Sequence, residues 1–217
     1  MTPPAIVRAA ARAGLDLIAI CDHNAAGNVA AVMEAARATT HAPVVIAGME
    51  ISTAEEVHIL GLFPTLEAAL AAEAVIQATL PRATSAYTRR QGRQELMDAR
   101  GAVVGRCPLM LAVGCGLKLA EAVAMIHHHG GLAVASHVDR PSFSATSQLG
   151  FIPPDVGFDA IEMSSGGRDR IQSFRPLELP MIFSSDSHFP SQIGGARMAI
   201  AMGEPTFAEL RRAFEET

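Results

Sequence analysis

Residues 15–23 read Leu-Asp-Leu-Ile-Ala-Ile-Cys-Asp-His, an almost continuous apolar run that ends in an acid and a histidine. A run of this kind is typical of a β-strand buried on both faces, as in a parallel sheet covered by helices. In α/β proteins, ligands and reactive groups collect at the carboxyl ends of such strands. The stretch therefore predicts an α/β fold and makes Asp22 and His23 the first candidates for a functional site.

The same pattern returns further along the chain. Apolar runs at residues 43–47, 132–136 and 181–185 each lead to an acid or a histidine, and a run at 57–63 carries His58 near its start. Carboxylates and imidazoles are the ligands of hard-to-borderline divalent metals, so these positions together predict a metal site. The residues that follow the three runs are Glu50, His137, Asp186 and His188.

Each residue alone has a simpler explanation. Asp22 can accept a hydrogen bond in the loop that follows it. Glu50 can act as a helix-capping acid, and His137 can be a hydrogen-bonded histidine of the core. The metal site is favoured because these residues recur at strand ends, since no single motif among them is specific.

Helices are expected between the strands, and one segment differs in character from the rest. The expected helices begin after Thr2 and span residues 28–38, 64–79 and 118–129, with a final helix from Thr206. Residues 81–111 are polar, contain a run of arginines and include a hairpin turn at residues 98–101. We interpret residues 1–217 as one domain with this insertion, whose arginines are either a solvated surface or a loop that contacts substrate.

Composition narrows the class of protein. A net charge of −5 disfavours a nucleic-acid scaffold, which usually carries a basic surface. The three cysteines form no CxxC pair, and no apolar run reaches 18 residues without a glycine, proline or charge. A hydrophobic content of 49% is enough for a large core. We therefore expect a cytoplasmic α/β protein that does not enter a membrane.

Six short motifs, taken together, resemble the PHP (polymerase and histidinol phosphatase) family of metal-dependent phosphoesterases over nearly the full length. The motifs are AICDHN (19–24), GMEIS (48–52), EEVHILGLF (55–63), ASHVDRPSFS (135–144), QLGFIPPD (148–155) and SSDSH (184–188). The resemblance implies a distorted (β/α)7 barrel with up to three divalent ions, zinc, manganese or iron, at its mouth.

The resemblance also implies a role for each candidate. By position, Glu50 resembles a carboxylate that bridges two ions, with His58 and His137 as further ligands of one and Asp186 as a ligand of the other. A bridging carboxylate holds two cations close enough to grip both oxygens of a phosphate group.

Four further residues complete the implied site. His23 would serve a third ion together with His188. Asp22 resembles a residue that orients ligands rather than a ligand itself. Arg140 is either a clamp for phosphate oxygens or a partner in a salt bridge at the barrel rim.

The sequence departs from the family pattern at its start. Family members begin with a strand that carries His-x-His, and this sequence has no His-x-His before Asp22. The resemblance therefore implies a barrel that lacks its first strand, and a late start is favoured over an internal start or a degraded paralogue. We expect fewer than three bound metals, weak activity, and an unpaired edge at residues 15–21 that promotes homo-oligomers.

The predicted function is hydrolysis of a phosphomonoester or phosphodiester by metal-activated water. The substrate is expected to be small or nucleotide-like, with no membrane and no stable nucleic-acid scaffold as partner. Two alternatives remain open: an amidohydrolase-like metal hydrolase, and a non-catalytic module that senses a phosphorylated ligand.

Overall fold

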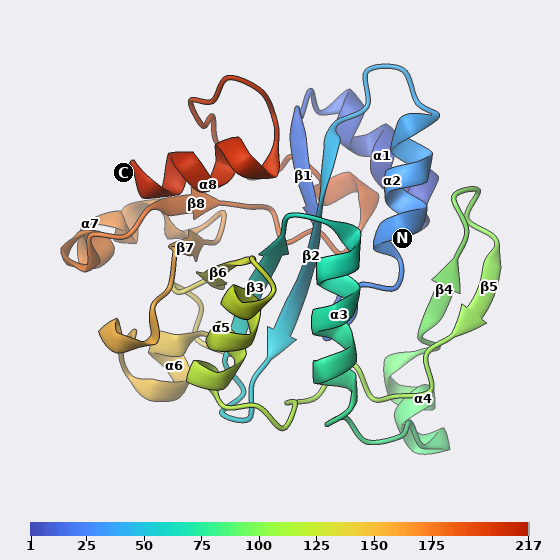
Figure 1. Ribbon diagram of the computed structural model, residues 1–217, viewed down its shortest axis with the longest axis horizontal. Helices are drawn as coiled ribbons and strands as arrows, with labels where there is room; N and C mark the ends of the chain where they lie inside the picture. Colours follow the sequence, from blue (N-terminus) through green and yellow to red (C-terminus); the bar gives the residue numbers. More distant parts are fainter. Residues whose placement is uncertain (217) are drawn as a thin grey trace.

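The computed structural model describes residues 1–216, and its centre is a curled sheet flanked by helices (Figure 1). Within those residues the main sheet has the strand order β1-β2-β3-β6-β7-β8. Its strands are β1 (Leu17–Ile20), β2 (Val44–Ser52), β3 (His58–Phe63), β6 (Leu132–Ala135), β7 (Ala160–Met163) and β8 (Met181–Phe183). The α/β class predicted from the apolar runs is therefore confirmed.

Strand β3 runs against its neighbours. β1 pairs with β2 in parallel, and β6, β7 and β8 also pair in parallel, whereas β3 is antiparallel to both β2 and β6. Only five residues, 53–57, separate β2 from β3, and a connection that short can join only antiparallel strands. The expected mostly parallel sheet thus contains one reversed strand.

The sheet is curled and open. In the part of the chain that the structure describes, β1 pairs only with β2 and β8 only with β7, so these two strands form the edges. The sheet corresponds to part of a barrel, and the seven-strand (β/α)7 closure implied by the resemblance is not seen in residues 1–216.

Helices on the outer face cover the larger hydrophobic core. α2 (Val29–Arg37), α3 (Leu66–Gln77) and α5 (Leu119–His128) pack on β2, β3 and β6, and α1 (Pro3–Arg12) packs on α2. Successive side chains of a strand point to opposite faces, so alternate residues of each strand belong to this core. They include Met49, Ile51, Ile59, Phe63 and Ala133, none of them more than 1% exposed.

The inner face of the sheet carries a second, smaller core under α8 (Phe207–Glu215) (Figure 1). Both faces of the central strands are covered, which explains why these strands have nearly unbroken apolar sequences. The buried residues of this core are Ile46, Leu62, Leu132, Val134, Ala160, Leu210 and Phe214.

Residues 81–111 stand beside the main sheet as a separate group (Figure 1). They contain α4 (Ser85–Gln91) and a two-stranded antiparallel sheet of β4 (Glu95–Met97) and β5 (Val103–Arg106). Their interpretation as an insertion into one domain stays a prediction. The remaining helices are short: α6 (Ala145–Leu149), α7 (Ile171–Phe174), and the 3-10 turns η1 (Pro154–Val156), η2 (Gly167–Arg170), η3 (Arg175–Leu177) and η4 (Pro190–Gln192).

Among residues 1–216, no helix combines the length and the apolar character needed to cross a bilayer.

Candidate metal centre

The inner face of the sheet changes from apolar to polar toward one end. In β2, Ile46 belongs to the inner core and Glu50, four residues on, has the same orientation. In β3, Leu62 and His58 are related in the same way. Because β3 is reversed, its first residue lies at the end of the sheet where β2 finishes. The reversal thus brings His58 to Glu50.

Three histidines surround the Glu50 carboxylate. Its Oε1 atom lies 3.0 Å from Nδ1 of His58 and 3.4 Å from Nε2 of His137, and its Oε2 atom lies 3.2 Å from Nδ1 of His23. Ligand atoms of His23, Glu50 and His58 all lie within 4.8 Å of one another. The structure therefore brings together four of the six predicted ligands.

Glu50 lies inside β2 rather than after it, which corrects the expected strand end and removes the helix-capping explanation. The side chain is buried, and burial by itself favours the neutral acid. Hydrogen bonds from His137 and His58 and the nearby charge of His23 outweigh this effect and hold the pKa of Glu50 well below its usual range. The carboxylate is thus ionised at neutral pH.

Two imidazole nitrogens test whether the cluster fits a metal ion. Among the described residues, Nδ1 of His23 and Nδ1 of His137 are buried and have no hydrogen-bond partner, although the first is close to Glu50. Buried polar atoms without partners are rare in folded proteins. Imidazole nitrogens without partners, on histidines that surround an ionised carboxylate, are ligands that a divalent cation can take, so the residues fit the metal that the family resemblance implies.

The segment after β1 continues the pairing with β2. The amide of Glu50 donates to the carbonyl of Asp22, and His23 bridges to Glu50, so the chain runs on alongside β2. This pairing places His23 opposite Glu50. Asp22 itself is exposed and its nearest polar partner is Asn28 Nδ2 at 3.5 Å, so the structure does not bring it into the cluster.

Asn24 is a site residue that sequence reasoning missed. It is fully buried, has a left-handed backbone with φ of 48°, and donates from Nδ2 to the carbonyls of Leu111 and Val113. Its Oδ1 accepts from the amide of Ser52, the last residue of β2. Asn24 therefore ties the His23 loop to β2 and to residues 111–113.

Glu162 is a second missed residue. It is buried on the inner face of β7, where it accepts hydrogen bonds from the amide of His137 and from the hydroxyl of Ser184. Burial raises the pKa of Glu162, although these hydrogen bonds oppose the shift and the charge of Glu50 adds to it. A lone acid in the apolar run Ala-Ile-Glu-Met was the signal that could have identified it.

The loop after β6 is strained where it meets the cluster. His137 and Phe143 have φ of 31° and 57°, values that side-chain-bearing residues seldom adopt. The ring of Phe143 stacks on His58 with centroids 4.8 Å apart, and the carbonyl of Phe143 accepts the amide hydrogen of His58. Phe143 thus covers one side of the His58 ring.

Asp186 and His188 form a second group rather than joining the Glu50 cluster. Asp186 Oδ2 lies 2.5 Å from Nη1 of Arg140, and His188 Nδ1 lies 3.9 Å from Asp186 Oδ1 with its side chain 62% exposed. Within residues 1–216, no hydrogen bond or ion pair joins this group to Glu50. The structure shows the rim salt bridge of Arg140, and its role as a phosphate clamp stays a prediction.

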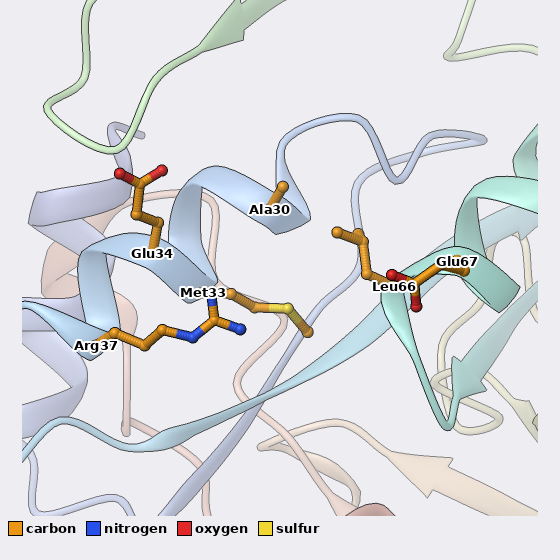
Figure 2. Close-up of a pocket in the computed structure, with 6 residues that line it drawn as sticks. All are labelled: Ala30, Met33, Glu34, Arg37, Leu66 and Glu67. Atoms are coloured by element: carbon orange, nitrogen blue, oxygen red, sulfur yellow. The ribbon is translucent and has the colours of Figure 1, made fainter.

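A surface hollow of about 430 Å³ lies between α2 and α3, away from these residues (Figure 2). Met33 and Arg37 of α2 and Leu66 and Glu67 near the start of α3 line it, and Figure 2 shows them facing one another across the gap. None of the predicted ligands lines this hollow, so we assign it no part in the site.

The curled sheet and the carboxylate with three histidines define an α/β protein with a metal-type centre at one end of its sheet. The C-terminal residues 172–217 match the PHP-associated family model. A search of curated proteins gave no match. The chain is similar to PHP proteins in its C-terminal sequence and in its fold, and the resemblance predicted from the six motifs is confirmed.

Three solved structures illustrate the similarity of fold. The lesion-specific endonuclease Q of Pyrococcus furiosus has 19% identity and a TM-score of 0.63, and the match covers 100% of this chain and 52% of that one. A protein from Bifidobacterium adolescentis named as a metal-dependent phosphoesterase has 18% identity, a TM-score of 0.60 and coverage of 98% and 90%. An amidohydrolase from Chromobacterium violaceum has 22% identity, a TM-score of 0.60 and coverage of 98% and 92%. The chain thus spans about half the length of endonuclease Q.

Proposed function

We propose that this chain is a metal-dependent hydrolase of the PHP type that cleaves a phosphomonoester or phosphodiester. The observation that carries the proposal is the ionised, buried Glu50 with His23, His58 and His137 on its two oxygens. A small or nucleotide-like phosphate ester is the substrate class that the family resemblance implies.

The residues of the cluster would hold zinc, manganese or iron. Oε1 of Glu50 faces His58 and His137, and Oε2 faces His23, so this carboxylate would be shared between two cations. Asp186 and His188 are proposed as further ligands of these two cations. A bound divalent cation would lower the pKa of a water molecule and neutralise charge on the phosphate group.

The remaining residues would position ligands and substrate. Glu162 and Asn24 hold the backbone of His137 and of the His23 loop, and Phe143 keeps water from one side of His58. Arg140 would offer its planar guanidinium to phosphate oxygens once it releases Asp186. Asp22 would orient ligands from the mouth of the site.

The number of ligands limits the number of ions. Six candidate side chains, one of them shared, are too few for three ions that each need three or four protein ligands. We therefore expect fewer than three tightly bound ions per chain, and slow hydrolysis. Elemental analysis of the purified protein measures this number, and three tightly bound ions would contradict our assignment of the ligands.

Glu50→Gln tests the proposal directly. Loss of the shared charge should weaken metal binding at least about 100-fold, beyond the roughly 10–100-fold cost of losing a residue that only supports a ligand. Glu56→Gln, an exposed acid in the turn after β2, is the matched control. Isothermal titration calorimetry measures the affinity of both variants for zinc and manganese. Equal affinities would show that Glu50 does not bind the metal.

A panel of substrates separates the alternatives. Hydrolysis of p-nitrophenyl phosphate or its bis-ester, without hydrolysis of amides, is the expected result. Cleavage of C–N bonds alone would favour the amidohydrolase-like reading, and binding of a phosphorylated ligand without turnover would favour the sensing module.

A further inference from the structure

The charge of this chain is divided unevenly between the insertion and the rest. Residues 81–111 contain six arginines and two acids, a net charge of +4, whereas the other 186 residues contain eleven basic and twenty acidic residues, a net charge of −9. Such an asymmetry indicates a surface that attracts anions within a molecule that otherwise repels them.

The arginines of the insertion are available at the surface. All six are exposed, and Arg106 is the one that approaches an acid, with Nη2 at 3.9 Å from Glu95. Among the residues that the structure describes, the other five form no ion pair. We call them the arginine surface: Arg82, Arg89, Arg90, Arg93 and Arg100.

The arginine surface is built on a fixed support. The hydroxyl of Tyr87 in α4 accepts hydrogen bonds from Gln94 Nε2 at 3.0 Å and from the amide of Ala112 at 2.8 Å. These bonds connect α4 to the residue before β4 and to the chain that leaves the insertion. A support of this kind lowers the entropy cost of binding, because the arginine-bearing segments are already ordered.

The insertion is also fastened to the loop that carries His23. Asn28 donates from Nδ2 to the carbonyl of Glu95 and accepts at Oδ1 from the amide of Met97, so it pairs with both ends of β4. Asn24 holds residues 111 and 113 at the other end of the insertion. Figure 1 shows α4 and the β4–β5 hairpin together on one side of the sheet, next to α2 and α3.

We propose that the arginine surface binds the phosphate backbone of a nucleic-acid strand and holds it beside the metal centre. The inference rests on the proposed function and narrows its substrate to a phosphodiester within a polyanion. Five arginines spread over α4, the hairpin and their flanks cannot all converge on one phosphate group, whereas they suit a row of phosphates. A nucleic-acid strand also offers the phosphodiester bond that the centre would cleave, which sulfated and carboxylated polyanions lack.

Binding is tested with a fluorescein-labelled oligonucleotide of about 20 nucleotides, single-stranded or duplex, in EDTA so that no metal contributes. The triple variant Arg89→Gln, Arg90→Gln, Arg93→Gln should bind at least about 10-fold more weakly. For single strands its salt dependence should lose a slope of about 2, since each phosphate contact contributes about 0.7. The protein's preference for the single-stranded or the duplex oligonucleotide shows which form the arginine surface binds.

The matched control is Arg8→Gln, Arg12→Gln, Arg37→Gln, which removes the same charge from exposed arginines of α1 and α2. Binding within about twofold of the parent is expected for this control. If both triple variants bound the oligonucleotide equally weakly, binding would depend only on overall charge, and the proposal would be overturned. Absence of binding by the parent, or preferential binding to phosphatidylserine vesicles, would overturn it as well.

The proposed function and the arginine surface can be tested separately. The arginine variant should hydrolyse bis-p-nitrophenyl phosphate at the parent's rate, because this ester has a single phosphate group and lacks the row of phosphates that the arginine surface is proposed to bind. If the parent cleaves the small ester and does not bind the oligonucleotide, the hydrolase stands and the arginine surface is refuted. If the parent binds the oligonucleotide through these arginines and cleaves no phosphate ester, the surface stands and the hydrolase is refuted.

Discussion

At the scale of single residues, the site residues that could be predicted from the sequence were those next to a recognisable strand. His23, Glu50 and His137 were predicted because each follows an apolar run, and His58 because it stands near the start of one; the structure brings these four residues together. Asn24 follows His23 directly, yet its role depends on carbonyls 87 and 89 residues away, which no local pattern indicates.

Asn24 is expected to support both stability and the site. Asn24→Gly leaves two partly buried carbonyls and the buried amide of Ser52 without their side-chain partner, and we expect a loss of about 2–3 kcal/mol in the free energy of unfolding. Asn24→Ala should cost about 1 kcal/mol more, because glycine tolerates the left-handed backbone and alanine does not. Urea denaturation measures both variants. Equal stabilities of the glycine and alanine variants would show that the backbone at residue 24 carries no strain.

The buried carboxyl group of Glu162 should make the stability of the protein depend on pH. Because burial raises its folded-state pKa, the contribution of Glu162 to stability is complete below the ordinary pKa of glutamate and is lost as pH rises through the folded value. Glu162→Gln should therefore gain stability relative to the parent as pH rises above about 4.3, the ordinary pKa of glutamate. The measurement is urea denaturation of metal-free protein, with exposed Glu56→Gln as the control. A stability difference that does not change with pH would contradict the prediction.

At the scale of elements, chain direction was harder to foresee than helix or strand type. The run at residues 57–63 was predicted as a strand. Its reversed direction follows from the short connection of five residues between β2 and β3, which the overall alternation of helices and strands made easy to overlook. The place of the hairpin could not be predicted, because Asn28, 67 residues before Glu95, holds it.

Asn28 should control the attachment of the hairpin. Asn28→Ala removes its two bonds to β4, so the amide of Met97 should exchange with deuterium at least about 10-fold faster, equivalent to about 1.4 kcal/mol. Amides within α2 should keep their protection, because Asn28 makes no side-chain cap bond to that helix. Unchanged exchange at Met97 would show that other contacts hold β4.

At the scale of the whole molecule, the apolar runs predicted the α/β class, and the family resemblance implied the unpaired edge at residues 15–21 that the open sheet shows. β1 and β8 are the two edges of the sheet in residues 1–216, and Ala19 of β1 is exposed. Apolar edge strands invite pairing with another chain, which was the reason to expect homo-oligomers.

Association through β1 is expected to depend on concentration. Ala19→Lys should raise the dimer dissociation constant at least about 10-fold, because a charge on an edge strand opposes pairing. Ala38→Lys, at the exposed end of α2, is the control. Sedimentation equilibrium measures the constant, and identical values for both variants would place any association elsewhere.

The tight turn between β2 and β3 limits how this sequence can change in length. Thr53 closes the turn through its carbonyl, its amide and its hydroxyl, and the register sets Ser52 opposite His58. A single added or deleted residue that shifted this register by one position would turn His58 to the outer face, and a shift of two would move it by more than 6 Å from Glu50. Residues 81–111 set no such register in the main sheet. Evolutionary variation in length is therefore expected to accumulate in the insertion, while the turn keeps its five residues.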